Sequence, residues 1–217
     1  MMYDRILFDL DGTLTEPKIG ITKSVNYALK KFGIHVTDLD TLIPFIGPPL
    51  VDSFIEFYGF TQEQALKAVE YYREYFSVTG LFENGVYDGI ENLLTELVRH
   101  ERHLFVATSK PTVFAKKILD HFKLTSYFDS IVGSNLDGTC VKKGDVIQVV
   151  LKEVPLVERK RTVMVGDRLH DVCGAKASGI DSIGVAYGYG GAGELRQAGA
   201  THLVYTVAEL QQFLLGE

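Results

Sequence analysis

The sequence is poor in cysteine, has no long apolar run and carries no excess of basic residues. Its two cysteines, Cys140 and Cys173, form no CxxC pair in 217 residues, which excludes a disulfide framework and a cysteine-rich zinc site. No stretch approaches the roughly 20 apolar residues of a membrane-spanning helix. We expect no signal peptide, because residues 1–10 contain charged side chains. The sequence predicts a soluble, cytoplasmic protein without a membrane partner.

Charge and composition narrow the class of protein and of partner further. The formal net charge of −6 argues against a nucleic-acid polymer as partner, because a phosphate backbone favours a concentrated basic face. The apolar fraction of 46% and the charged fraction of 23% are ordinary for a globular protein. Length alone leaves open whether the chain is one domain or a core with a smaller insertion, and the oligomeric state is equally open.

Short apolar segments alternate with helical patterns, which predicts an α/β fold with a parallel sheet covered on both faces. One predicted helix has an apolar face formed by Ile90, Leu93, Leu94, Leu97 and Val98. A second has Phe114, Ile118, Leu119 and Phe122 on one face, with Pro111 in its first turn. The predicted strands are Arg5–Asp9, His103–Ala107, Ser130–Gly133, Thr162–Val165, Ser182–Ala186 and Thr201–Val204.

Residues 15–85 interrupt this alternation. An amphipathic helix is predicted around Ile21–Phe32, and Thr61 with Gln64 forms a capping-box pattern at the start of another. No strand pattern lies between them. We therefore expect a catalytic core of residues 1–14 and 86–217 and an α-helical insertion of residues 15–85.

Polar side chains follow the predicted strands or begin the neighbouring helices. Ligands bind outside the carboxyl ends of the strands in an open parallel sheet, so these side chains should converge there. Several carboxylates brought together repel one another unless a cation lies among them. The converging residues are Asp9, Asp11, Thr108, Ser109, Lys110, Lys143, Asp167 and Asp171.

Carboxylates without histidine or cysteine suit Mg²⁺, and Mg²⁺ beside a lysine forms a receptor for phosphate. Asp9 at a strand end can attack phosphorus and form an aspartyl-phosphate. Asp11 can protonate the leaving alkoxide and later accept a proton from water. This pattern predicts a Mg²⁺-dependent phosphatase that acts on a small phosphorylated metabolite.

Each segment also has a structural interpretation. Thr108 and Ser109 match a helix cap, and Asp167 and Asp171 match acidic residues of a first helical turn. Either Lys142 or Lys143 could supply the cation, and most such lysines lie on the surface. The joint occurrence of these segments in one chain order favours a catalytic site over the structural interpretations.

The sequence resembles the haloacid dehalogenase superfamily, specifically phosphatases similar to phosphoglycolate phosphatase and bacterial 5′-nucleotidase. Four motifs carry this resemblance over essentially the whole chain, in order. They are Asp9–Leu14, Ala107–Pro111 with Thr108, Lys143–Ile147 with Lys143, and Gly166–Asp171.

The resemblance implies a Rossmann-like core with a helical cap. It implies that Asp9, the backbone carbonyl of Asp11 and Asp167 bind Mg²⁺, with Asp171 behind them or acting through water. Thr108, Ser109 and Lys143 would hold the phosphoryl group.

The segment Phe45–Leu50 resembles the family's substrate-specificity loop. We expect Gly47, Pro48 and Pro49 to contact the substrate, although the same residues also suit a rigid turn before a helix. Tyr187–Gly190 resembles a segment of the nucleotidase-like branch.

Two alternatives remain at this point. A phosphotransferase similar to β-phosphoglucomutase has the same four motifs, and a phospho-receiver signalling module also gathers acidic residues, a threonine and a lysine. The physiological phosphate ester is not determined by the motifs.

Overall fold

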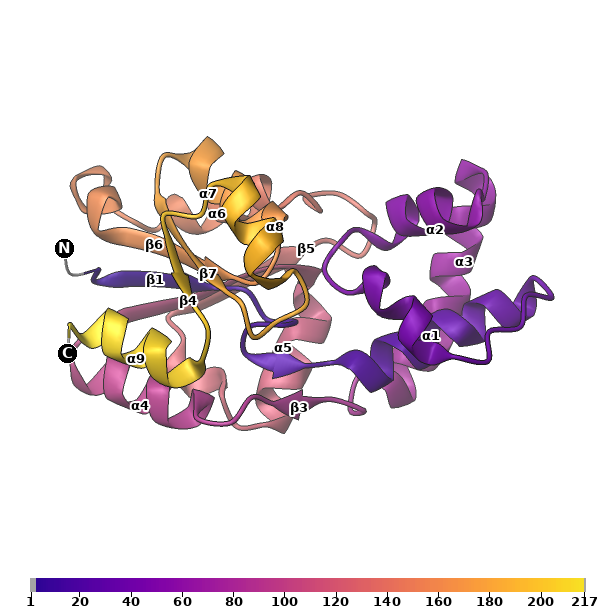
Figure 1. Cartoon of the computed structure of the whole chain (residues 1–217), viewed down its shortest axis with the longest axis horizontal. Coiled ribbons are helices and arrows are strands. Elements are labelled where there is room, and N and C mark those ends of the chain that lie inside the picture. Colours follow the sequence, from indigo (N-terminus) through magenta and orange to yellow (C-terminus); the bar gives the residue numbers. More distant parts are fainter. Residues whose placement is uncertain (1–2, 217) are drawn as a thin grey trace. The chain divides into compact units, whose positions relative to one another are not determined.

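A computed structural model describes residues 3–216, and the chain divides into two compact units (Figure 1). One unit comprises Met1–Glu16 and Val86–Glu217, and the other comprises Pro17–Gly85. We call them the core unit and the helical unit. Residues 15 and 16, which we expected in the insertion, form strand β2 (Thr15–Glu16) and belong to the core unit.

The core unit contains a six-stranded parallel sheet of order β5-β4-β1-β6-β7-β8. This is the Rossmann-like order, with the first strand in the middle and successive strands added outward on each side. It confirms the predicted fold class. The strands are β1 (Arg5–Phe8), β4 (His103–Pro111), β5 (Ser130–Ser134), β6 (Thr162–Gly166), β7 (Asp181–Val185) and β8 (His202–Val204).

The central strands are in register at the carboxyl end of β1. Phe8 of β1 is in register with Val106 of β4 and with Val165 of β6. The residues that follow these positions therefore emerge side by side at the carboxyl edge. The strand order reverses at β1, and this is the position at which open α/β sheets bind ligands.

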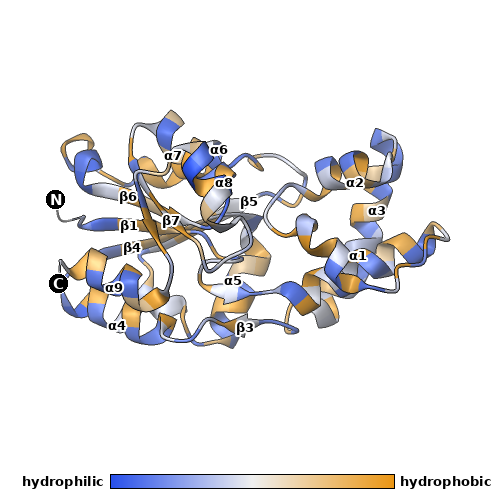
Figure 2. Ribbon diagram, viewed as in Figure 1, coloured by the Kyte–Doolittle hydropathy of each residue, from blue (hydrophilic) through white to orange (hydrophobic). Residues whose placement is uncertain are grey.

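Helices cover both faces of the sheet, with α4, α5 and α9 on one face and α6, α7 and α8 on the other (Figure 1). Apolar and polar positions alternate along them, as expected for helices with one buried face (Figure 2). No helix within residues 3–216 is long and apolar enough to cross a membrane. The helices are α4 (Ile90–Arg99), α5 (Thr112–His121), α6 (Lys143–Leu151), α7 (Leu169–Ser178), α8 (Gly191–Ala198) and α9 (Val207–Leu215).

Two local predictions were wrong. Val98 is 46% exposed, whereas Leu94 and Leu97 of the same helix are fully buried. At 100° per residue Val98 lies at the edge of the apolar stripe, where the sheet no longer covers it. In addition, β4 continues past Ala107 through an irregularity in its pairing to Pro111. Pro111 therefore occupies the N-cap position before α5 and does not lie in the first turn of that helix.

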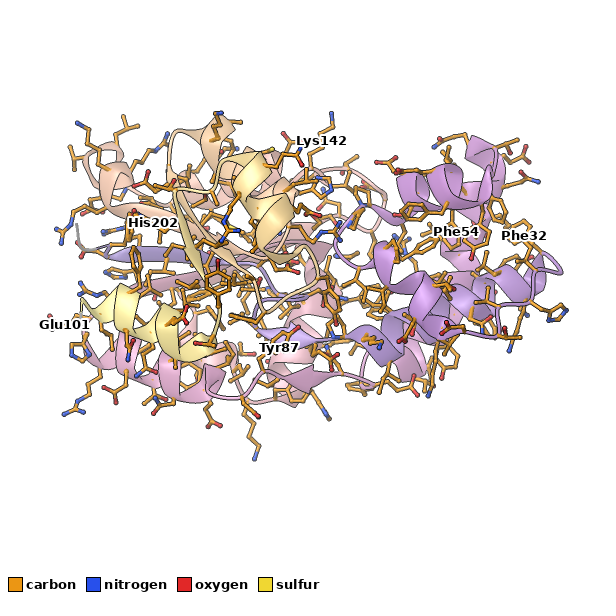
Figure 3. The ribbon with its side chains drawn as sticks, viewed as in Figure 1. Phe32, Phe54, Tyr87, Glu101, Lys142 and His202 are labelled. Atoms are coloured by element: carbon orange, nitrogen blue, oxygen red, sulfur yellow. The ribbon has the colours of Figure 1, made fainter. Side chains whose placement is uncertain are left out.

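The helical unit contains α1 (Lys18–Lys31), α2 (Leu50–Tyr58) and α3 (Gln62–Tyr75). A 3₁₀ segment, η1 (Leu39–Phe45), precedes α2, and a π-helical turn, η2 (Phe76–Gly80), follows α3. The predicted capping box is present. The Thr61 amide donates to Gln64 Oε1 at 2.9 Å, and the Gln64 amide donates to Thr61 Oγ1 at 3.2 Å. Figure 3 labels Phe32 and Phe54 of this unit, and both pack against Phe60, with ring centroids 4.7 and 5.8 Å away.

The chain passes between the units twice, and both passages are extended. Strand β2 lies at the first passage and β3 (Gly85–Val86) at the second, and the two form a small separate sheet. On the core side, the Tyr87 amide donates to the Leu14 carbonyl at 3.2 Å. The passages are therefore joined to each other by backbone pairing.

Candidate active site

The loop after β1 places Asp9 and Asp11 at the carboxyl edge of the sheet. The Asp9 amide donates to the Val165 carbonyl at 2.9 Å, so Asp9 continues the pairing between β1 and β6. Gly12 then takes a left-handed conformation with φ of +83°, which glycine adopts without a steric penalty. A Cβ at Gly12 would also overlap the Asp167 carboxylate, so this position excludes a side chain for two reasons.

Of Lys142 and Lys143, it is Lys143 that reaches this edge. Its Nζ lies 2.7 Å from Asp9 Oδ1 and 3.0 Å from Asp171 Oδ1, and it donates to the Ala107 carbonyl at 3.0 Å. Lys142 precedes α6 and is exposed on the outside of the core unit (Figure 3). Within residues 3–216, the side chain of Lys143 contacts the acidic residues and that of Lys142 does not.

Close packing of α6 and α7 brings Lys143 to Asp171. A Cβ at Gly174 of α7 would lie 3.0 Å from the Gly144 amide nitrogen and 3.2 Å from Lys143 Cγ. These distances are shorter than ordinary van der Waals contact. The absence of a side chain at Gly174 therefore lets the two helices approach closely enough for the ion pair.

Three buried carboxylates form a candidate metal site. Asp9, Asp167 and Asp171 each offer an oxygen, and these oxygens lie within 4.8 Å of one another. Asp167 Oδ1 is buried without a hydrogen-bond partner among residues 3–216, whereas its Oδ2 accepts from the Tyr189 amide at 2.7 Å. An oxygen-only donor set with one unpartnered carboxylate oxygen fits Mg²⁺.

Asp171 faces Lys143 on one side and the Arg168 amide on the other. Its Oδ1 pairs with Lys143, and its Oδ2 accepts from the Arg168 amide at 3.0 Å. These contacts fit the expected position of Asp171 behind the direct ligands. A Cβ at Gly166 would overlap the Asp171 side chain, so the glycine that ends β6 makes room for it.

Burial of like charges shifts the titration of these groups. Burial, then repulsion from Asp171 and Asp9, raises the pKa of Asp167 well above its ordinary value. Burial raises the pKa of Asp171 to about 6, although attraction to Lys143 partly offsets the rise. For Lys143, burial would lower the pKa, but Asp171 and Asp9 outweigh it and the net shift is upward. The lysine stays charged, whereas Asp167 and Asp171 keep their protons to a higher pH than an ordinary carboxyl group unless a cation joins them.

Asp11 lies outside the carboxylate cluster and pairs with Lys110 instead. Lys110 Nζ is 2.8 Å from Asp11 Oδ2, and both side chains are buried. Burial raises the pKa of Asp11, and the nearby ammonium group of Lys110 partly offsets this rise. From the sequence we expected Lys110 at this edge of the sheet, but we predicted no partner for it. The expected metal contact of the Asp11 backbone carbonyl stays a prediction.

Thr108 and Ser109 occupy the irregular end of β4. Thr108 is buried, and its Oγ1 accepts from the Lys110 amide at 3.3 Å. Ser109 is half-buried, and its carbonyl accepts from Ser134 Oγ at 2.8 Å. Neither side chain caps α5, because Pro111 precedes that helix without a side-chain cap. The helix-cap interpretation of Thr108 and Ser109 was therefore wrong.

An ion pair behind the site escaped sequence reasoning. Glu194 of α8 accepts from Arg168 Nε at 2.9 Å and from the Leu169 amide at 2.7 Å through the same oxygen. It thereby caps the start of α7, the helix that carries Asp171. No local pattern links residues 168 and 194, so only the sheet topology could have indicated this contact.

The predicted specificity loop belongs to the helical unit. Gly47 has φ of +104°, and Pro49 directly precedes α2. Gly47, Pro48 and Pro49 are all partly exposed. The segment thus turns directly into α2, and contact with a substrate stays a prediction.

Comparisons with known proteins confirm the resemblance that the motifs indicated. The sequence model of haloacid dehalogenase-like hydrolases matches residues 6–185. A 5′-nucleotidase of Pseudomonas aeruginosa is 49% identical over 214 residues, covering 99% of this chain and 96% of the relative. Tyrosine-protein kinase PtkA of Mycobacterium tuberculosis is 39% identical over 96% of this chain and 72% of its own length. The crystal structure of a predicted phosphatase from Clostridium acetobutylicum has a TM-score of 0.95 at 52% identity, covering 100% of both chains.

Proposed function

The chain belongs to the haloacid dehalogenase-like hydrolases and is a phosphatase, and we propose that it hydrolyses small phosphate monoesters in a Mg²⁺-dependent reaction through an aspartyl-phosphate on Asp9. One observation carries this proposal. The carboxylates of Asp9, Asp167 and Asp171 are buried together with Lys143 at the carboxyl edge of the sheet. Such a cluster is stable when a cation shares it, and a cation beside a lysine attracts phosphate.

The proposed roles follow from the contacts. Asp9, Asp167 and the Asp11 backbone carbonyl would hold Mg²⁺, which supplies Lewis-acid stabilisation of the phosphoryl oxygens. Lys143 and Thr108 would bind the same oxygens. Asp9 attacks phosphorus while Lys143 and the Leu10 amide, each 2.7 Å from Asp9 Oδ1, orient its carboxylate.

Asp11 is proposed as the general acid and base. Its Oδ1 has no hydrogen-bond partner among the described residues and would carry the proton. That proton passes to the leaving alkoxide, and Asp11 then accepts one from the water that attacks the aspartyl-phosphate. Lys110 holds Oδ2 and so orients the carboxyl group.

The relatives suggest where to look for the substrate. The 5′-nucleotidase relative matches along nearly all of both chains, which makes nucleoside 5′-monophosphates the first class to test. Phosphoglycolate and sugar phosphates come next. The loop Gly47–Pro49 of the helical unit is our candidate for discriminating among them, and exchanging it for another member's loop should change substrate preference.

The experiment measures phosphate release from this panel with and without Mg²⁺, for the wild type and Asp9→Asn. We expect Mg²⁺-dependent release by the wild type and none by Asp9→Asn, because an amide cannot form the acyl-phosphate. Retained activity in the folded variant would disprove the role of Asp9. Full turnover in excess chelator would disprove the role of the metal.

Phosphotransfer is a second candidate, because one relative is named a tyrosine-protein kinase. The same aspartyl-phosphate would then pass to an acceptor other than water. Adding a sugar phosphate or a tyrosine peptide to the assay separates the two outcomes. Isomerised sugar or phosphotyrosine in place of free phosphate would favour transfer.

A further inference from the structure

We infer that the loop Tyr187–Gly190, which follows β7, is a positioning element of the active site. It holds the Asp167 carboxylate so that one of its oxygens faces the carboxylate cluster. The inference rests on the proposed function, because Mg²⁺ is the ligand for which that oxygen is held.

The first observation is a hydrogen bond that makes the two Asp167 oxygens unequal. The Tyr189 amide donates to Oδ2 at 2.7 Å, and Oδ1 is buried without a hydrogen-bond partner within residues 3–216. Rotation of the carboxylate would break this bond and leave a partly buried amide unpaired, which is unfavourable. The backbone of the loop therefore selects the oxygen that remains for a metal.

The second observation is the close approach of two glycines. A Cβ at Gly188 would overlap the Asp167 side chain and the Gly12 carbonyl, and a Cβ at Gly190 would overlap the Asp167 carbonyl. Neither glycine has the left-handed backbone that itself favours glycine. The loop thus lacks side chains at these positions because Asp167 lies directly against it.

The third observation is that the loop Tyr187–Gly190 also contacts the loop after β1, which carries Asp9 and Asp11. Tyr187 donates from its hydroxyl to the Thr13 carbonyl at 2.9 Å. Its ring meets the edge of Tyr87, which Figure 3 labels, with 5.1 Å between the ring centroids. Burial raises the pKa of Tyr187, so its hydroxyl remains a donor. The loop therefore contacts both acidic segments and sets the distance between them.

The test measures Mg²⁺ binding by isothermal titration calorimetry on the full chain, without substrate. Gly188→Ala should raise the Mg²⁺ dissociation constant about 10–100-fold, as loss of groups that orient metal ligands does in other sites. Gly193→Ala is the matched control, because a Cβ there meets nothing within 4 Å. It should bind within about twofold of the wild type.

The outcomes separate the inference from the proposed function. A folded Gly188→Ala protein with wild-type Mg²⁺ affinity would overturn the inference, even if its melting temperature fell, because a merely structural loop lowers stability alone. A wild type that binds no Mg²⁺ would overturn the proposed function instead.

Tyr187→Phe decides the matter should Gly188→Ala fail to fold. It removes one hydroxyl at constant shape and should weaken Mg²⁺ binding about threefold or more, because the loop loses its bond to Thr13. Equal affinity of Tyr187→Phe and the wild type would refute the positioning role.

Discussion

Withdrawing Mg²⁺ should make the stability of the core unit depend on pH, because burial raises the pKa of Asp167 and of Asp171. The pKa of Asp171 is raised from 3.8 to about 6 in the fold. An acid with a raised folded-state pKa stabilises the fold below its unfolded pKa, and this contribution is lost as pH rises through the folded value. For these two pKa values the loss between pH 5 and pH 7.5 is about 1.4 kcal/mol, or about 3–6 °C in melting temperature. The raised pKa of Asp167 acts in the same direction.

The assay is thermal unfolding at pH 5 and pH 7.5, in chelator and in excess Mg²⁺. The chelated protein should melt lower at pH 7.5 than at pH 5, and Mg²⁺ should raise the melting temperature more at pH 7.5, since it binds the ionised carboxylates. Asp171→Asn is the control, because an amide does not titrate in this range. An equal Mg²⁺ effect at both pH values, or an unchanged pH slope in Asp171→Asn, would refute the argument.

Two further predictions concern neighbouring residues with different environments. Lys143→Met should lower phosphatase activity by about 10²-fold or more, because it removes a donor from the phosphoryl site. Lys142→Met should leave activity unchanged, and equal losses from both would contradict the assignment of Lys143. In α4, Leu94→Ala should lower the free energy of unfolding by about 2–5 kcal/mol and Val98→Ala by about 0.5 kcal/mol or less. Denaturant titration measures both, and similar costs would show that Val98 is buried in solution.

The strands of the core were predictable because a covered parallel sheet requires apolar side chains on both faces. Segments such as Thr162–Val165 carry that pattern without interruption, and β6 is buried throughout. The end of β4 was not predictable, because Thr108–Pro111 is polar and its extended course depends on pairing of Pro111 with Ser134 of β5. Sequence periodicity reports burial, and it reports tertiary pairing only indirectly.

The candidate site was predictable to the extent that short motifs carry it. Asp9, Asp167, Asp171 and Lys143 all reach the carboxyl edge of the sheet, as we expected. Their roles in metal and phosphate binding stay predictions. The partner of Asp11 was missed because nothing in the spacing of Lys110 distinguishes a buried ion pair from a surface lysine.

The pairing of β1 with both β4 and β6 has a consequence for how the acidic cluster forms. β1 is made first but stands in the middle, so it lacks both hydrogen-bonded neighbours until residue 103 and then residue 162 have been synthesised. Pairing over such sequence separations is slow, since a long stretch of chain must first be closed into a loop. A nascent chain that stops before β6 lacks Asp167 and Asp171, so the acidic cluster with Asp9 can form only after residue 171 has been synthesised.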